Sequence, residues 1–309
     1  MLGTVFLLLA LSLTDETRVI ERLGALDLQG ALLVLCASIA SIVVRGLRWR
    51  GLLSPMVTLG ASEVMAAYAI ANTTNMLAPA RLGDLVRARL VARGRSRTAT
   101  VLASVAVERF LDLSILTILL WVASIALRED RYRFLGIALA VGVTLVFLAG
   151  AWISLRLGPT QQESGSTPSG RILHHLFEHG RQFTEGLRSV SAGRRIWILG
   201  AAWSSLAWAA SILAVGAALQ VADIAVPIAA VILVEALFEL AGALPSAPAF
   251  IGTIQAASIA ALVPFGIPAD AAVAFSLLYQ AAFVSASVLM GAVGLSTIFV
   301  IRRTRDGKG

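Results

Sequence analysis

Long apolar runs are the feature of this sequence that most limits how the chain can fold. Five such runs, rich in aliphatic side chains, occupy residues 30–47, 99–125, 134–155, 196–219 and 270–301. A hydrocarbon core about 30 Å thick is crossed by a helix of about 20 apolar residues. Hydrophobic residues make up 58% of the chain and charged residues 14%, a balance unlike that of a soluble domain. The sequence therefore predicts an all-α polytopic membrane protein with a single transmembrane domain over residues 1–309.

Lysine and arginine are unevenly distributed between the apolar runs. Of the 25 such residues, 19 lie in four segments, 45–50, 81–97, 156–195 and 302–308. Cytoplasmic loops of membrane proteins are enriched in Lys and Arg, so we expect these segments, and the C-terminus, to be cytoplasmic. Trp49 is then expected at interface height. The net charge of +7 follows from this topology, and no nucleic-acid partner is predicted.

Two shorter apolar segments lead into helix-breaking residues instead of polar loops. If residues 62–78 crossed the membrane, the six arginines of 81–97 would lie outside. A re-entrant hairpin that enters from the cytoplasm and returns there avoids this. The segment 225–243, followed by LPSAPAFIG, suggests a second hairpin that enters from the outer face. The hinge residues expected in the two hairpins are Pro79, Gly83, Pro245, Pro248 and Gly252.

The two hairpins also resemble each other in sequence. PARLGDL (79–85) aligns with PAFIGTI (248–254), with Pro, Ala and Gly identical. We expect an inverted repeat of span, broken hairpin and span, with repeat 1 at about 30–125 and repeat 2 at about 196–301. A cytoplasmic loop, 156–195, joins them, and within it 171–190 can form a short surface helix. Many secondary transporters share this plan and bind substrate where the broken elements meet. The alternative is a chance likeness of two Pro/Gly turns.

Charged side chains gather in the first hairpin and the span after it. Glu108, Arg109 and Asp112 fall on one face of a helix, so Arg109 can pair with Asp112. Glu108 then needs another partner, for which Arg81 and Arg87 are available. An arginine fork also suits a phosphate group. The charges can therefore form a structural ion-pair network or a site for a polar headgroup.

Four more polar residues lie where a membrane protein rarely places them. Asn72 and Asn75 precede the first hairpin turn, where their amides can satisfy freed backbone groups or contact a ligand. Glu235 and Glu239 share one helix face with no basic residue nearby in the sequence. Each must take up a proton or reach a cation across the bundle, so proton coupling and support of the second hairpin are both open.

No catalytic motif stands out from the sequence. His175-Leu176-Phe177-Glu178-His179 has the spacing of one zinc protease class, but its loop leaves no room for a catalytic domain. A phosphate-binding Gly-rich loop and a Cys-x-x-Cys pair are missing from the sequence. We therefore expect no metal, no cofactor and no ATP hydrolysis by this chain.

An ordered set of motifs resembles the flippase-like transmembrane domain of lysylphosphatidylglycerol synthases. The set is RWRGLL (48–53), Glu63, N-x-x-N-x-L-A-P-A-R-L-G-D-x-x-R (72–87), S-x-A-V-E-R-x-x-D (104–112) and LPSAPAFIG (244–252). The resemblance implies a stand-alone inner-membrane protein that moves a lipid or lipid-linked headgroup between leaflets. It carries over the matching positions Arg81, Gly83, Arg87, Glu108, Arg109 and Asp112. Asp84 replaces the usual Glu, Ala249-Phe250 the usual glycines, Gln255 an acid and Gln280 a frequent arginine.

The function expected is therefore a headgroup translocase that binds a membrane lipid with an anionic or phosphate-bearing headgroup. A membrane-embedded enzyme acting on a lipid phosphate, with Glu108 or Asp112 as acid or base, is one alternative. A non-transporting partner of a lipid-modifying enzyme is another. The expected substrate-binding residues are Asn72, Asn75, Arg81, Asp84, Arg87, Glu108, Arg109, Asp112, Glu235, Glu239, Gln255 and Gln280.

Overall fold

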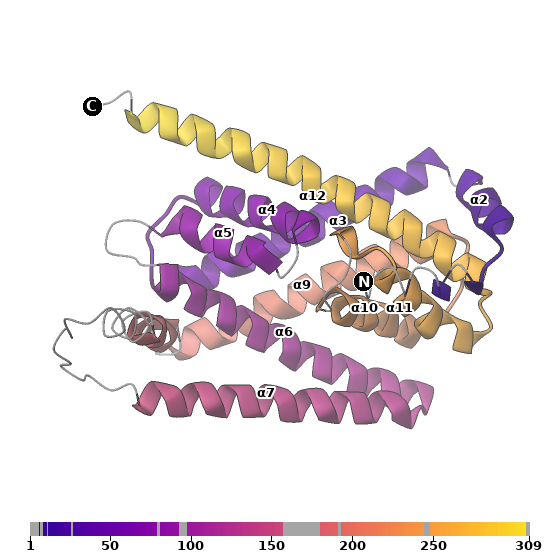
Figure 1. The fold of residues 1–309 in the computed structure, drawn as a ribbon, viewed down its shortest axis with the longest axis horizontal. Helices are drawn as coiled ribbons and strands as arrows, with labels where there is room; N and C mark the ends of the chain where they lie inside the picture. The colour runs from indigo at the N-terminus through magenta and orange to yellow at the C-terminus, as the bar shows by residue number, and fades with distance from the viewer. Residues whose placement is uncertain are drawn as a thin grey trace, which may run out of the picture.

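The protein is a bundle of α-helices, with no strand in the residues described (Figure 1). The computed structural model describes residues 6, 9–10, 12–25, 27–78, 81–92, 98–156, 180–190, 193–243 and 248–306. Its helices are α2 (Glu16–Gly24), α3 (Leu28–Leu53), α4 (Ala61–Leu77), α5 (Leu82–Val91), α6 (Thr98–Leu127), α7 (Asp130–Arg156), α9 (Arg194–Val221), α10 (Ile228–Ala243), η2 (Pro248–Phe250), α11 (Thr253–Leu262), η3 (Val263–Phe265) and α12 (Ala269–Asp306). The predicted all-α fold is confirmed.

Four of the five apolar runs, 30–47, 99–125, 196–219 and 270–301, lie in segments that could cross a membrane, and the run 134–155 lies within the 27-residue helix α7. Five described segments are long and apolar enough to cross a membrane, namely Leu28–Leu53, Thr98–Leu127, Arg194–Val221, Pro248–Phe265 and Ala269–Thr304. The fourth is not one straight helix, because Ala249 has a φ of 57°. Its α-helical part, α11, has 10 residues, and so does α5. Each is about 15 Å long, half of a hydrocarbon core.

The tips of both short-helix hairpins need unusual backbone conformations. Arg81 has a φ of 53°, and Phe250, at the aligned position, has a φ of 60°. A glycine follows in each hairpin. A Cβ on Gly83 would lie 2.0 Å from the backbone oxygen of Ala71, so α4 and α5 can approach this closely only at a glycine. Of the three expected hinge prolines, Pro248 begins η2, and Pro79 and Pro245 lie outside the described residues.

The two halves of the bundle, α3 to α6 and α9 to α12, pack in a matched pattern. α3 runs antiparallel to α9, because Gly30 lies against Val221 and Leu52 against Gly200. α4 packs along α12, and its counterpart α10 packs along α6. An inverted repeat requires corresponding helices to run in opposite directions, as α3 and α9 do. The arrangement supports the repeat, which stays a prediction in its detail.

Helix ends that the charge pattern places on one side of the membrane lie together. In Figure 1 the end of α5, the end of α7 and the end of α12 lie toward the left, whereas α2 and the turn between α6 and α7 lie to the right. The hairpin of α4 and α5 occupies the left part and that of α10 and α11 the right part. Which end faces the cytoplasm remains a prediction.

Two expectations about the periphery can be compared with the structure. Trp49 is fully buried inside the bundle, where its indole N–H donates to Ser104 Oγ at 3.1 Å, and its height in the membrane stays a prediction. The described residues 180–190 form a helix, as expected, with Arg181 and Glu185 on its exposed face. Its other face packs on the bundle, where Val190 is fully buried with Leu52, Val107 and Leu111. The rest of 171–190, the His175–His179 motif and most of 1–13 lie outside the described residues.

Gly83→Ala should destabilise the first hairpin, because the new methyl group collides with the Ala71 carbonyl and α4 and α5 must separate. Overpacking of this kind costs about 1–3 kcal/mol. We expect a lower thermal midpoint in fluorescence-detected size-exclusion chromatography. Gly142→Ala in α7 is the matched control, since a Cβ there meets nothing within 4 Å. Equal midpoints for the two variants would contradict the tight contact at Gly83.

Candidate functional site

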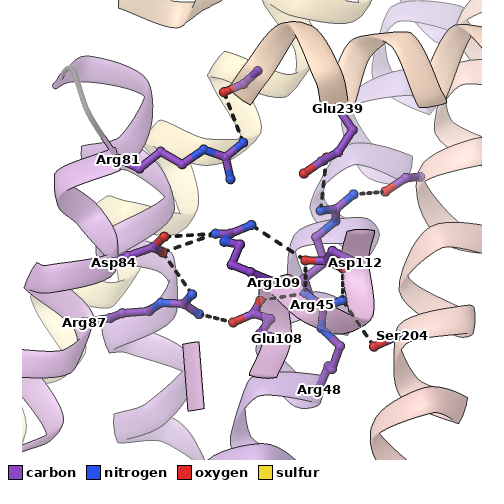
Figure 2. A network of polar contacts seen from close by, with 12 residues as sticks. Arg45, Arg48, Arg81, Asp84, Arg87, Glu108, Arg109, Asp112, Ser204 and Glu239 are labelled. Atoms are coloured by element: carbon purple, nitrogen blue, oxygen red, sulfur yellow. Dashed lines mark hydrogen bonds and ion pairs between the residues drawn. The ribbon is translucent and has the colours of Figure 1, made fainter. Parts of the chain in front are cut away.

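Six buried or half-buried charges from α3, α5 and α6 form one connected set, here called the ion network (Figure 2). Its members are three arginines and three carboxylates, namely Arg48, Arg87, Arg109, Asp84, Glu108 and Asp112. The network thus contains equal numbers of positive and negative charges. This balance matters because an unpaired charge in an apolar interior is very costly.

Arg48 is the link that sequence reasoning missed. Its guanidinium bonds both oxygens of Asp112 and donates to Glu108 Oε1 at 2.6 Å. The side chain is 1% exposed, so Arg48 is not the cytoplasmic flank that the charge pattern suggested. The reason is that α3 continues six residues beyond the apolar run 30–47. Arg45 and Arg48, one turn apart, therefore face the bundle, and their i, i+3 spacing was the available signal.

Glu108 is held by two arginines, one on each oxygen. Besides Arg48, Arg87 Nη1 lies 2.7 Å from Glu108 Oε2, so of the two partners expected for Glu108 the structure selects Arg87. Arg87 also lies 2.9 Å from Asp84 and packs over the rings of Trp49 and Tyr68, at 4.8 and 5.4 Å. Its guanidinium is thus paired with two carboxylates and stacked on two aromatic rings of the protein.

Arg109 pairs with Asp112, as expected, but Asp112 is not its nearest partner. The Arg109–Asp112 distance is 3.7 Å, whereas Arg109 Nη2 donates to both oxygens of Asp84 at 3.1 and 3.3 Å. Asp84 comes from the first turn of α5, on the hairpin. Sequence spacing could show only the partner on the same helix, and the closer one depends on how α5 packs against α6.

A second charged group joins α3 to the second half of the protein. Arg45 lies 3.5 Å from Glu235 and 3.6 Å from Glu239, and it donates to Ser211 Oγ at 2.9 Å. Glu235 and Glu239 therefore reach a cation across the bundle, one of the two outcomes expected for them. Because both acids share this one arginine, the contact also fixes α10 relative to α3.

A cavity of about 140 Å³ lies between the two halves and beside the ion network. α3, α4, α5 and α6 form one wall, and α9, α10, η2, α11 and α12 form the other. Its polar lining consists of Arg45, Asn72, Asn75, Arg81, Asp84, Arg87, Glu108, Arg109, Ser211, Glu235 and Glu239. The opposite half contributes aromatic rings, among them Phe238, Tyr279 and Phe283. Most residues expected at a binding site thus meet at one cavity.

Arg81 is the arginine of this lining with the least internal pairing. Its Nη2 donates to the carbonyl of Gly242 at 3.1 Å, which joins the tips of the two hairpins. Within the described part of the chain, no carboxylate lies within 4 Å of its guanidinium. In Figure 2 it extends from α5 toward the second half, above Arg109.

Three of the four amides of the expected site support the hairpin tips. Asn75 Oδ1 accepts from the Gly83 N–H at 2.7 Å, and Gln255 Oε1 accepts from the Gly252 N–H, also at 2.7 Å. These glycines occupy aligned positions of the two hairpins. Gln280 bonds Gln255 and the backbone, and neither glutamine lines the cavity, so a contact with substrate stays a prediction for both. Asn72 lines the cavity and donates to Ser287 Oγ at 2.9 Å.

Removing one member of the Arg48–Asp112 pair should cost more than removing both. Arg48→Leu leaves Asp112 without its main partner, and Asp112→Leu leaves Arg48 with one carboxylate partner, Glu108, instead of two. Breaking a buried ion pair in this way costs about 3–5 kcal/mol. The Arg48→Leu/Asp112→Leu variant keeps the network balanced, and Glu108 retains Arg87. We expect its thermal midpoint to exceed those of both single variants.

The control is Glu185→Ala, which removes an acid from an exposed i, i+4 pair with Arg181 and should change the midpoint little. Strictly additive losses in the double variant would show that Arg48 and Asp112 do not act as a pair.

The family described as lysylphosphatidylglycerol synthase TM region matches residues 1–291 of 309, and these residues include the ion network, both hairpins and the cavity. No curated protein matches the chain. The chain therefore belongs to the lysylphosphatidylglycerol synthase transmembrane family, a membrane family connected with lipids.

Proposed function

We propose that this protein moves a phosphate-bearing lipid headgroup between the leaflets of the inner membrane through the cavity between its two halves. The observation that carries the proposal is Arg81, a cation at the cavity without a carboxylate partner among the described residues. An arginine offers two parallel N–H donors to a phosphate, and no neutral group does so as well.

A polar cavity addresses the main physical obstacle to lipid translocation. The acyl chains can stay in lipid, but the charged headgroup must pass a core where a charge costs at least about 2.5–3.5 kcal/mol. Arg81 and Arg109 can offset the phosphate charge, while Asn72 and Ser211 supply hydrogen bonds to polar oxygens. The sequence has no nucleotide-binding loop, so we propose that the lipid moves down its own gradient or with an ion.

The meeting of the hairpins suggests how access could alternate. Their tips touch through Arg81 and the Gly242 carbonyl, and each tip leads into a 10-residue helix that is too short to cross the membrane by itself. A small rearrangement at this contact would open the cavity toward one leaflet or the other. We place the C-terminus on the cytoplasmic side on the strength of the arginine distribution.

Catalysis on a lipid phosphate is less consistent with the site. Glu108 and Asp112, the acids suggested for it, each bind arginine through both oxygens. A general acid must carry a proton and a general base must reach its substrate. Both carboxylates are thus already paired with arginines of the protein and are almost fully buried. No three His, Cys, Asp or Glu side chains in the described ranges group as a metal site requires.

Arg81→Gln should abolish headgroup transfer while the protein stays folded. The change removes the charge and one fork of donors but leaves a polar side chain of similar length. Transfer would be measured in liposomes containing purified protein, as the dithionite-accessible fraction of a fluorescent phospholipid over time. Arg81→Lys should restore transfer only in part, because an ammonium keeps the charge and loses the planar fork.

Arg89→Gln is the matched control, since Arg89 is an exposed arginine on the same helix. Transfer at the wild-type rate by Arg81→Gln would remove Arg81 from the site. Release of a modified lipid by purified wild type would favour the enzyme. Absence of both transfer and product would favour the non-transporting partner.

A further inference from the structure

Asp84 is the most exposed acid of the ion network. Its side chain lines the cavity and is 17% exposed, whereas the side chain of Glu108, which also lines the cavity, is 2% exposed and that of Asp112 is 5% exposed. Arg109, its partner, is 31% exposed, so both members of this pair can be reached from the cavity. The side chains of the remaining members, Arg48, Arg87, Glu108 and Asp112, are at most 5% exposed.

The carboxylate of Asp84 occupies donors that a phosphate would use. Arg109 Nη2 donates to its two oxygens at 3.1 and 3.3 Å, and Arg87 Nη2 lies 2.9 Å from Oδ1. Arg81 lies one turn earlier in the chain. A phosphate between Arg81 and Arg109 would compete for the same N–H groups, because guanidinium binds both kinds of anion in the same forked geometry.

We propose that Asp84 is a resident counter-ion, which holds Arg109 in the empty cavity and is displaced by the phosphate of an entering headgroup. The inference rests on the proposed function and adds a role for one residue. Arg87 keeps Glu108 as a partner when Asp84 moves, and Arg109 keeps Asp112 at 3.7 Å, so the buried network stays paired during the exchange.

Such competition weakens binding and speeds release. A site made of free arginines would hold a phosphate tightly and give it up slowly. With Asp84 present, the departing phosphate is replaced by an internal anion, and the arginines are never left without one. The same residue therefore lowers affinity and raises the rate of transfer, which a purely structural residue cannot do.

Asp84→Asn should raise the affinity for the phosphate and lower the rate of transfer. Binding would be measured by calorimetry in detergent, with dihexanoyl phospholipids bearing glycerol, ethanolamine or choline headgroups as probes. We expect at least about fivefold tighter binding of the phospholipids that wild type binds, the low end of typical couplings between competing ligands. Transfer in liposomes should become slower than in wild type.

Three further variants separate charge from shape. Asp84→Ser removes the same charge with a smaller side chain and carries the same expectation if Asp84→Asn folds poorly. Asp84→Glu keeps the anion and should behave nearly as wild type. Glu185→Gln removes an exposed negative charge far along the chain and should change neither property.

Weaker or unchanged binding by Asp84→Asn and Asp84→Ser would overturn the proposal, and so would failure of every probe to bind both wild type and these variants. The proposed function fails separately, if Arg81→Gln transfers lipid as wild type does. Loss of affinity and transfer together would assign Asp84 a structural role.

Discussion

The buried pairing of arginines with carboxylates is the interaction on which the rest of this structure depends. Arg48 comes from α3, Arg87 and Asp84 from the first hairpin, and the remaining members from α6. None of these helices could bury its own charge alone, because an isolated ion in an apolar interior is too costly. Together they cancel one another, so the network fixes the hairpin against the span and gives the cavity one rigid, charged wall.

The opposite wall is built differently, because it contributes two glutamates, one serine and aromatic rings to the cavity. Arg45 reaches from α3 to both glutamates of α10, and Arg81 donates to the Gly242 carbonyl. The two halves are also joined by a hydrogen bond between Ser41 and Ser211 and by the packing of α3 along α9 and of α4 along α12. The charges of the first half are thus paired mainly with one another, whereas packing and neutral hydrogen bonds, together with Arg45, hold the two halves together.

Sequence reasoning predicted the helices and the hairpins well, because membrane thickness and charge distribution act on runs of residues. It also predicted that Glu108, Arg109 and Asp112 would lie together, since they share a helix face. It missed Arg48, and it named Asp112, not Asp84, as the partner of Arg109. Both errors concern contacts between helices, and a single sequence does not show which residues of one helix lie opposite which residues of another. The match between Arg81 and Phe250 in backbone conformation likewise became visible only in the structure.

Occupancy of the cavity by a lipid headgroup is the central claim, and mass spectrometry of protein purified in mild detergent tests it most directly. Cys36, the single native cysteine, is exposed and would first be replaced by serine. A cysteine at Phe283, which lines the cavity, then allows a bulky maleimide to fill it. We expect one phosphate-bearing lipid bound per protein molecule before labelling and none after it. Equal lipid binding before and after labelling would show that the lipid headgroup does not occupy the cavity.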